Sequence, residues 1–416
     1  MANYTSFGAP DILTTLYPHG VEEEFMAEFP SYGLFAKKLD YLTERGRELN
    51  WQISGSGGAA TSVAESEANE NASIHARPMI TRVREYATAT VEREDILATR
   101  NDKDRIIEVW QLAISNCIRG IKRSWGTHIF RDGSGIKAYT ASGNNYASTT
   151  LVLATANDAK LFEEQDWIQA TGDSVHLSDT GAKIMVTGRN IQAGKLFFAG
   201  NVSSAIPSIA DGYGLLRSGD LNSVVKGLGA WIPKTAPVVG GGDSFFGIDR
   251  APYGEAAFGH RPTSTSSNLL NIGIDAAAYM YDVTGMSPDL WLVNSLDFAA
   301  IVKDITSLEQ YIVPAEGLNG KKADIGYEAV RFHGPHGKIE LVVDPLIPRG
   351  SSWMGVKDEA QWWTLGPMID QIDLGMGNEN GFVKVGVDGV GIRFGGFGQF
   401  VVLRPWDWAF VALPTA

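Results

Sequence analysis

A chain of 416 residues is long enough for about two or three domains, since single hydrophobic cores usually stop growing well below this length. Hydrophobic residues make up 44% and charged residues 20%, a globular composition that excludes disordered, collagen-like and membrane-embedded classes. The formal net charge of −13 argues against a protein whose main task is to grip phosphates over a basic surface.

The sequence contains 11 Trp and 18 Phe, more large apolar groups than one compact surface can expose. They must fill cores or subunit contacts, which favours oligomerisation. The single Cys117 excludes an intramolecular disulfide, and its apolar helical setting is typical of a packed thiol. The opening MANYTSFGAP has no basic region followed by an apolar run, so we expect synthesis in the cytoplasm.

The first part of the chain predicts an extended arm followed by a long hairpin. Pro10, Pro18 and Pro30 interrupt the arm, which we place at 1–45. A strand-like run at 49–54 and a second at Met79–Val91 flank a polar stretch at Gly55–Asn71, which is typical of a mobile tip. Strands of about 13 residues would span roughly 40 Å, so we expect the hairpin at 46–98 to lie on a neighbouring subunit.

The clearest predicted helix runs from Asp102 to Arg123, with Asn101 as its cap. Acidic residues near its start and basic residues near its end complement the helix dipole. Its apolar residues follow the helical period along one face: Ile106, Ile107, Trp110, Ile114, Cys117, Ile118 and Ile121. This helix and part of the adjoining domain are assigned to 99–146.

Short β-rich runs separated by Asp, Gly and Asn turns change the character of the chain over 147–203. The runs are Thr149–Ala154, Trp167–Gln169, Lys183–Val186 and Lys195–Ala199. We expect a small β-barrel or sandwich inserted into the main domain, folding by itself and lying on the outer surface of any assembly.

The rest of the chain predicts an α/β domain at 204–369 and a strand-rich ending at 370–416. A helix at Ser267–Val283 closed by Gly285 precedes a buried strand at Leu290–Val293, and Asn294 or Ser295 caps the next helix, to about Ile305. The later strands are expected at Ala329–His333, Lys338–Val343, Ser352–Val356, Gln361–Leu365, Phe382–Val387, Gly391–Phe394, Gln399–Arg404 and Trp408–Leu413.

Patterns for chemistry are weak throughout the sequence. His333 and His336 flank a Gly-Pro pair that is typical of a turn between strands, and a metal site needs at least a third ligand. No nucleophile elbow, His-Glu-x-x-His or Walker-type motif occurs in the sequence. We therefore expect no catalytic, cofactor-binding or metal-binding residues.

The order of these elements resembles the Hong Kong 97-type fold of tailed-bacteriophage major capsid proteins. That fold has an N-arm, an extended E-loop, a spine helix, an A-domain, and a P-domain completed by C-terminal strands. Four local phrases resemble one subgroup of the family: Gly219–Pro233, Asp289–Asp304, Tyr327–Gly350 and Gly389–Leu413. The expected fold class is therefore α+β, a Hong Kong 97-type capsid fold with an inserted small β-rich domain.

The resemblance implies a structural protein of the virion that assembles into hexamers and pentamers of an icosahedral shell around double-stranded DNA. Its implied partners are further copies of itself, a portal protein, a decoration protein in some lineages, and a separate scaffolding protein, because no long charged helical prefix precedes the arm. Two alternatives stay open. One is an encapsulin-type nanocompartment shell protein, and the other is a soluble β-rich hydrolase.

The expected E-loop supplies the candidate subunit-contact residues. They are Trp51, Arg77, Arg82, Arg84, Glu85, Tyr86, Glu92 and Arg93. Arginine and glutamate are suited to charge pairs across an interface, while Trp51 and Tyr86 can bury apolar area. Some relatives crosslink their subunits through a lysine on this loop, but no lysine lies between Lys38 and Lys103, so we expect non-covalent cohesion.

Overall fold

The computed structural model describes residues 33–53, 59–70, 74–92, 103–307, 330–334, 337–371, 382–383 and 389–414. The chain forms two compact units. The first comprises residues 1–47, 81–227 and 362–400, and the second comprises 48–80, 228–361 and 401–416. Each unit contains helices and sheet, which confirms the predicted α+β class.

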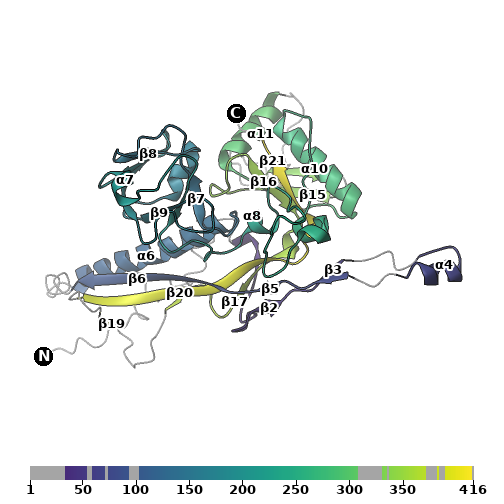
Figure 1. Cartoon of the computed structure of the whole chain (residues 1–416), viewed down its shortest axis with the longest axis horizontal. Coiled ribbons are helices and arrows are strands. Elements are labelled where there is room, and N and C mark those ends of the chain that lie inside the picture. Colours follow the sequence, from purple (N-terminus) through teal and green to yellow (C-terminus); the bar gives the residue numbers. More distant parts are fainter. Residues whose placement is uncertain are drawn as a thin grey trace, which may run out of the picture. The chain divides into compact units, whose positions relative to one another are not determined.

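A long helix beside a long pair of strands is the main feature of the first unit (Figure 1). Helix α6 spans Lys103–His128, and strand β6 spans Val83–Glu92. Strand β20, Gly389–Val402, pairs antiparallel with β6 from Gly389 opposite Glu92 to Gly398 opposite Val83. The C-terminal part of the chain therefore returns to the strand that precedes the helix, and the two expected strands at 391–404 are one.

Four shorter strands complete this six-stranded sheet around β20. They are β1 (Ala36–Lys38), β17 (Ala360–Thr364), β18 (Asp370–Gln371) and β19 (Phe382–Val383).

Helix α6 continues past its predicted end because its last turns are buried in the first unit. From Ile114 onward the apolar stripe is buried as expected, including Cys117 and Ile121. Beyond Arg123, the fully buried Trp125 stacks on Trp362, with ring centroids 5.4 Å apart and an interplanar angle of 14°. These tertiary contacts extend the helix to His128 although Gly126 is a poor helix former.

A small closed β-barrel follows α6 in the chain. Its strands lie in the order β7-β12-β9-β10-β11-β8, and the bridge between Thr140 and Leu153 joins the last strand to the first. The strands are β7 (Ile136–Tyr139), β8 (Thr150–Val152), β9 (Trp167–Thr171), β10 (Ile184–Asn190), β11 (Lys195–Phe198) and β12 (Gly214–Arg217). The short helices η1 (Ala156–Leu161) and α7 (Val202–Ala205) lie in its connections.

The expected inserted β-rich domain is thus present, but its sheet extends beyond 147–203. Strands β7 and β12 lie outside that range; they pair with each other, and β12 also pairs with β9. Neither strand has a strongly alternating sequence of its own, so local periodicity does not predict them. The barrel belongs to the first unit together with α6.

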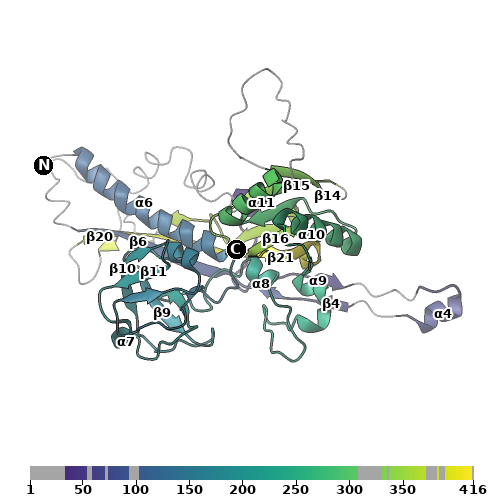
Figure 2. The same cartoon turned by 90° about the horizontal axis from the view of Figure 1, so that it is seen from above.

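The core of the second unit is a five-stranded sheet, β14-β15-β13-β16-β21, packed against helices α10 and α11 (Figure 2). The central strand β13, Leu290–Val293, matches the prediction and is buried along its whole length, because it has a strand on each side and apolar side chains on both faces. The other strands are β14 (Val330–Gly334), β15 (Gly337–Val343), β16 (Ser351–Gly355) and β21 (Trp408–Ala412).

The helices of this unit begin and end close to their predicted capping residues. Helix α10, Leu269–Thr284, starts where the Asn268 side chain accepts a hydrogen bond from the Asn271 amide, and it ends at Gly285 with φ 70°. Helix α11, Ser295–Ser307, starts at Asn294, whose Oδ1 accepts from the Leu296 amide. The remaining short helices are α8 (Leu228–Trp231), η2 (Ala251–Tyr253), α9 (Glu255–Phe258), η3 (Lys357–Glu359) and η4 (Pro405–Asp407).

The expected hairpin differs from two continuous long strands. Short strands β3 (Trp51–Ile53) and β4 (Ile74–Ala76) pair with each other, as do β2 (Arg47–Glu48) and β5 (Met79–Ile80). The stretch predicted as a mobile tip contains helix α4, Val63–Ala68, capped by the Ser62 side chain. Strand β6 leaves the hairpin and pairs with β20 instead, a pairing too distant in sequence for any local pattern to indicate.

Candidate subunit-contact surface

Strand β6 has one buried face and one exposed face. Glu85 and Ala89 are buried, whereas Arg84, Tyr86 and Thr88 are exposed. This alternation is the period of a strand that is covered on one side only. The candidate contact residues of β6 therefore fall into two groups with different surroundings.

The covered face lies against α6, and small residues let the helix approach. Alanine at positions 87 and 89 adds little bulk on β6, and Gly396 on β20 lies opposite Glu85. A Cβ atom on Gly396 would lie 2.3 Å from the Met368 carbonyl oxygen and 2.9 Å from the Trp125 ring. Glycine is therefore required at this position.

The open face of β6 and β20 is basic and aromatic. Tyr86 is 54% exposed, and its ring meets that of Phe397 edge to face, with centroids 5.8 Å apart. Arg84 is opposite Phe397, and exposed Arg393 is opposite Thr88. The described part of this face offers hydrogen-bond donors beside an aromatic pair, which suits contact with another protein surface.

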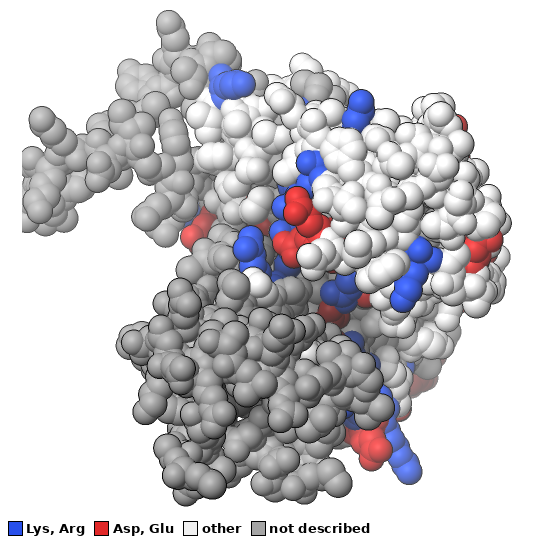
Figure 3. Space-filling model, turned by 90° about the vertical axis from the view of Figure 1, so that its left-hand side faces the viewer, with Lys and Arg blue, Asp and Glu red and all other residues white. Residues whose placement is uncertain are grey.

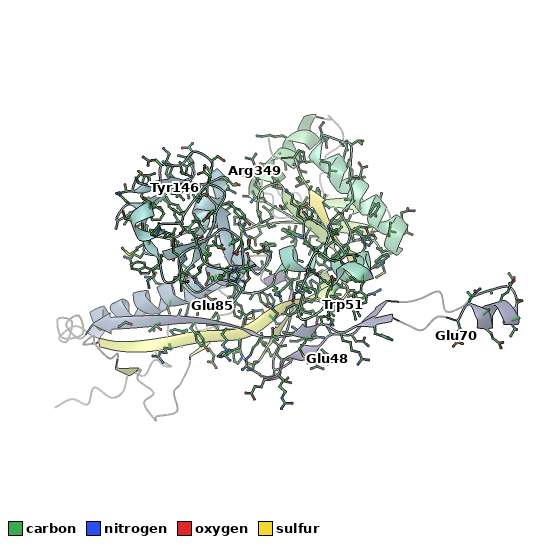
Figure 4. All side chains as sticks on the ribbon, in the orientation of Figure 1. Glu48, Trp51, Glu70, Glu85, Tyr146 and Arg349 are labelled. Atoms are coloured by element: carbon green, nitrogen blue, oxygen red, sulfur yellow. The ribbon has the colours of Figure 1, made fainter. Side chains whose placement is uncertain are left out.

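Glu85 has its partner within the chain. The Glu85 side chain is labelled in Figure 4. Its carboxylate binds the Arg217 guanidinium, which also contacts Asp220 at 2.9 Å. The Glu85 and Asp220 side chains are each only 6% exposed. This ion pair fixes β6 to the end of the barrel strand β12, so Glu85 is occupied before any neighbouring subunit arrives.

A buried charge cluster surrounds this ion pair. His128 Nε2 lies 3.7 Å from Asp220 Oδ2, and both side chains are buried. Burial lowers the pKa of His128 and that of the nearby Lys137. Burial alone would raise the pKa of Asp220, but its contacts with His128 and Arg217 outweigh this and lower it. The cluster joins α6, β6 and the barrel within the first unit.

Trp51 is also an internal contact. Its side chain is 5% exposed and meets the Trp231 ring edge to face, with centroids 6.0 Å apart. Trp231 in turn packs on Phe245 at 4.9 Å, and the Phe246 carbonyl accepts a hydrogen bond from the Met79 amide. This aromatic group anchors the base of the expected E-loop to the rest of the second unit.

The other candidates have varied surroundings. Arg77 is exposed and Arg82 is half-buried. Glu92 pairs through its backbone with Gly389, and its side chain lies outside the described residues, as does all of Arg93. Sequence reasoning missed Arg217, Asp220 and His128, and no local pattern could have found them, since Arg217 and Glu85 are 132 positions apart.

A small hollow lies among the described residues of the second unit. A hollow of about 220 Å³ is lined by Asp289, Leu290, Lys338, Glu340 and Lys357, and burial raises the pKa of Asp289. Its volume is below the roughly 300–1,000 Å³ of typical ligand pockets. Within the described ranges, no three or more His, Cys, Asp or Glu residues are grouped to hold a metal ion.

Figure 3 shows one face of the molecule, on which small groups of both signs are separated by wide uncharged areas. No described helix combines the length and the apolar character needed to cross a membrane.

Comparison with solved structures finds capsid and particle proteins of low sequence identity. The chain is similar to a protein of the cyanophage A-1(L) capsid asymmetric unit, with a TM-score of 0.48, 9% identity, and coverage of 94% of this chain and 93% of that chain. It is similar to a capsid protein of a native GTA particle, with a TM-score of 0.44, 9% identity, and coverage of 92% and 89%.

A third similar structure is the virus-like particle from Pyrococcus furiosus, with a TM-score of 0.39, 6% identity, and coverage of 94% and 95%. No family model matches the sequence, and no curated protein matches it.

Proposed function

We propose that this protein is the major capsid protein of a tailed bacteriophage, forming hexamers and pentamers of an icosahedral shell that encloses double-stranded DNA. The pairing of β20 with β6 beside α6 is the observation that carries this proposal. The resemblance to the Hong Kong 97-type fold implies that the C-terminal strands return to the spine helix. Nothing in the local sequence at 389–402 or 83–92 requires it.

Surfaces left open in the single chain support self-assembly as the mechanism. Helix α4 has no buried residue, although a helix of this length is unstable alone in water. The open face of β6 and β20 exposes Tyr86, Arg84 and Arg393. Both surfaces gain from contact with a neighbouring subunit, as a shell provides.

The proposal includes the location and the partners that the resemblance implies. The protein is made in the host cytoplasm and resides in the virion, where it contacts further copies, a portal protein and packaged DNA held without sequence specificity. A scaffolding protein acts during assembly, and a decoration protein can add to the outside. The barrel lies on the outer surface of the shell, and the protein carries no enzymatic activity.

Two alternatives remain distinct from this proposal. An encapsulin-type shell protein would assemble in the same way but enclose proteins. A soluble β-rich hydrolase would act through a pocket that holds acids of perturbed pKa. Among the described residues, the hollow at Asp289 is where such chemistry would be sought.

Electron microscopy of the purified protein, with nuclease protection of its contents, tests the proposal. Closed icosahedral shells carrying double-stranded DNA are expected from infected or induced cells. Shells filled with protein cargo would favour the encapsulin alternative. Small monodisperse particles that never assemble would contradict both the capsid hypothesis and the encapsulin hypothesis.

A further inference from the structure

The chain enters and leaves the barrel through two short connections that lie against each other. Residues 129–135 lead from α6 to β7, and residues 218–227 follow β12. A Cβ atom on Gly135 would lie 2.5 Å from the Asp220 carbonyl oxygen, so the connections touch. Among the described strands, the six of the barrel pair only with one another. The barrel therefore has a sheet of its own and joins α6 at one junction.

Charged side chains connect the barrel side of this junction to α6 and β6. Arg217, at the end of β12, binds the Glu85 carboxylate on β6. Asp220, in the returning connection, lies 3.7 Å from the His128 ring at the end of α6. A Cβ atom on Gly227 would lie 2.2 Å from the His128 carbonyl oxygen, so the returning chain packs directly on the end of the helix.

The charges at the junction balance one another only while His128 is neutral. Glu85 and Asp220 supply two negative charges, and Arg217 and the buried Lys137 on β7 can supply two positive ones. An ordinary lysine keeps its proton to a pH about four units higher than an ordinary histidine, so Lys137 takes the proton first. A proton on His128 then adds a positive charge that nothing balances, and an unbalanced charge in the interior is costly.

The charged groups near His128 come from each element that meets at the junction. Asp220, Lys137 and Glu85 lie near its ring, on the returning connection, β7 and β6. Both carboxylates already bind Arg217. The next charged groups outward are of both signs: Arg123, Arg131, Asp132, Asp158, Glu163, Asp166, Arg189 and Lys226. The two carboxylates beside His128 are thus already taken up by an arginine.

The sign of the pH dependence follows from the burial of His128. Burial lowers the pKa of its ring in the closed junction. An open junction lets water reach the ring, which then titrates near the ordinary value of about 6.5. The closed form is therefore favoured above that pH, and below it the open form gains by up to about tenfold per pH unit. Ordinary carboxylates are still ionised at about pH 5, so the histidine responds before them.

We propose that His128 is a pH-sensitive switch: when its ring binds a proton, the junction opens and the barrel moves away from β6 and α6 as one folded body. Opening separates Arg217 from Glu85, while the sheet of the barrel stays paired. The switch lies within one unit of a single chain, so it does not depend on the proposed function.

Distances between two spin labels in the full-length free subunit test this motion directly. Phe197→Cys places one label on the barrel, and Arg84→Cys places the other on the exposed face of β6. The control pair, Val175→Cys with Phe197→Cys, lies wholly on the barrel. Native Cys117 adds little label, because its thiol is buried and burial raises its pKa to about 12.

The pair that joins barrel and β6 should give one distance at about pH 7.5, and a second, longer distance should appear at about pH 5. The longer distance should disappear when the pH is restored, and the control pair should not change. No change in the first pair, or an equal change in the control pair, would overturn the proposal.

Two substitutions separate the proton on His128 from a general effect of acid. His128→Gln has no proton to gain, so the share of the longer distance should be the same at both pH values. Lys137→Met removes the competing cation, so a proton on His128 restores the balance and this variant should be more open at about pH 7.5 than at about pH 5. Lys195→Met, at an exposed position on the same barrel, is the matched control and should open like the unchanged protein. Acid opening that persists in His128→Gln, or that keeps its direction in Lys137→Met, would show that His128 is not the switch.

Discussion

The last strand and the tip of the expected E-loop differ in what holds them. Strand β6 is paired with β20 along its length, lies against α6 and is joined to Arg217 through Glu85. Segment 59–70 buries no residue of its helix. We expect the hairpin at 46–98 to lie on a neighbouring subunit, but strand β6 within it is already paired by the chain itself. We therefore expect segment 59–70, the tip, to depend most on a neighbouring subunit.

Blocking the close approach of β20 to its neighbours should cause the largest loss of unfolding free energy. Gly396→Ala places a Cβ atom 2.3 Å from a carbonyl oxygen, so we expect a loss of roughly 3 kcal/mol or more in unfolding free energy. Denaturant unfolding of the soluble subunit measures it. Gly120→Ala in α6 is the control, because its Cβ meets nothing within 4 Å and the change should stabilise the helix by about 0.5–1 kcal/mol.

Breaking the Glu85–Arg217 pair should also loosen β6. Glu85→Ala leaves a mostly buried guanidinium with one carboxylate fewer, and we expect a loss of about 2–3 kcal/mol. Arg84→Ala, the neighbouring position on the exposed face, should change the unfolding free energy by less than about 0.5 kcal/mol. Equal effects of the two changes would show that β6 is not held through its covered face.

Hydrogen exchange of the free subunit compares strand β6 with segment 59–70 directly. Amides of β6 that pair with β20 should exchange at least roughly a hundredfold more slowly than amides of segment 59–70. Assembly should then slow exchange at the tip much more than in β6. Strong protection of the tip in the free subunit would contradict its dependence on a neighbour.

Acidification should lower the unfolding free energy of the first unit through His128. The unfolded chain binds the proton near the ordinary histidine pKa of about 6.5, whereas burial lowers the pKa of His128 in the fold. Stability from this group is therefore complete above that pH and is lost as the pH falls below it, by at most about 1.4 kcal/mol per pH unit. Unfolding of His128→Gln between pH 7.5 and 5 should show a smaller slope, with exposed His75→Gln as the control.

Boiling mature particles in detergent should produce the smallest change of all. No lysine lies between Lys38 and Lys103, so neither end of the E-loop supplies an amine for an isopeptide bond. We expect one band near the 45.0 kDa monomer. A ladder of multimers that persists under reducing conditions would show that the subunits are joined covalently.

Elements set by their own residues could be predicted from the sequence, and those set by distant contacts could not. Strand β13 and the cap of α10 at Gly285 follow from a local apolar run and a local glycine. The end of α6 depends on the stacking of Trp125 on Trp362, far along the chain. The same holds for the candidate surface, where the local residues predict a strand at Met79–Val91 but not that Arg217 is the partner of Glu85.

The strands that open and close the barrel are neighbours in its sheet. Ile136 on β7 is the register partner of Leu216 on β12, and paired residues of an antiparallel ladder have Cα atoms about 5 Å apart. The chain therefore leaves for the barrel and comes back at nearly one point. The whole module can therefore be inserted, removed or exchanged by changing the backbone at two neighbouring points, without altering the path of α6 or β20.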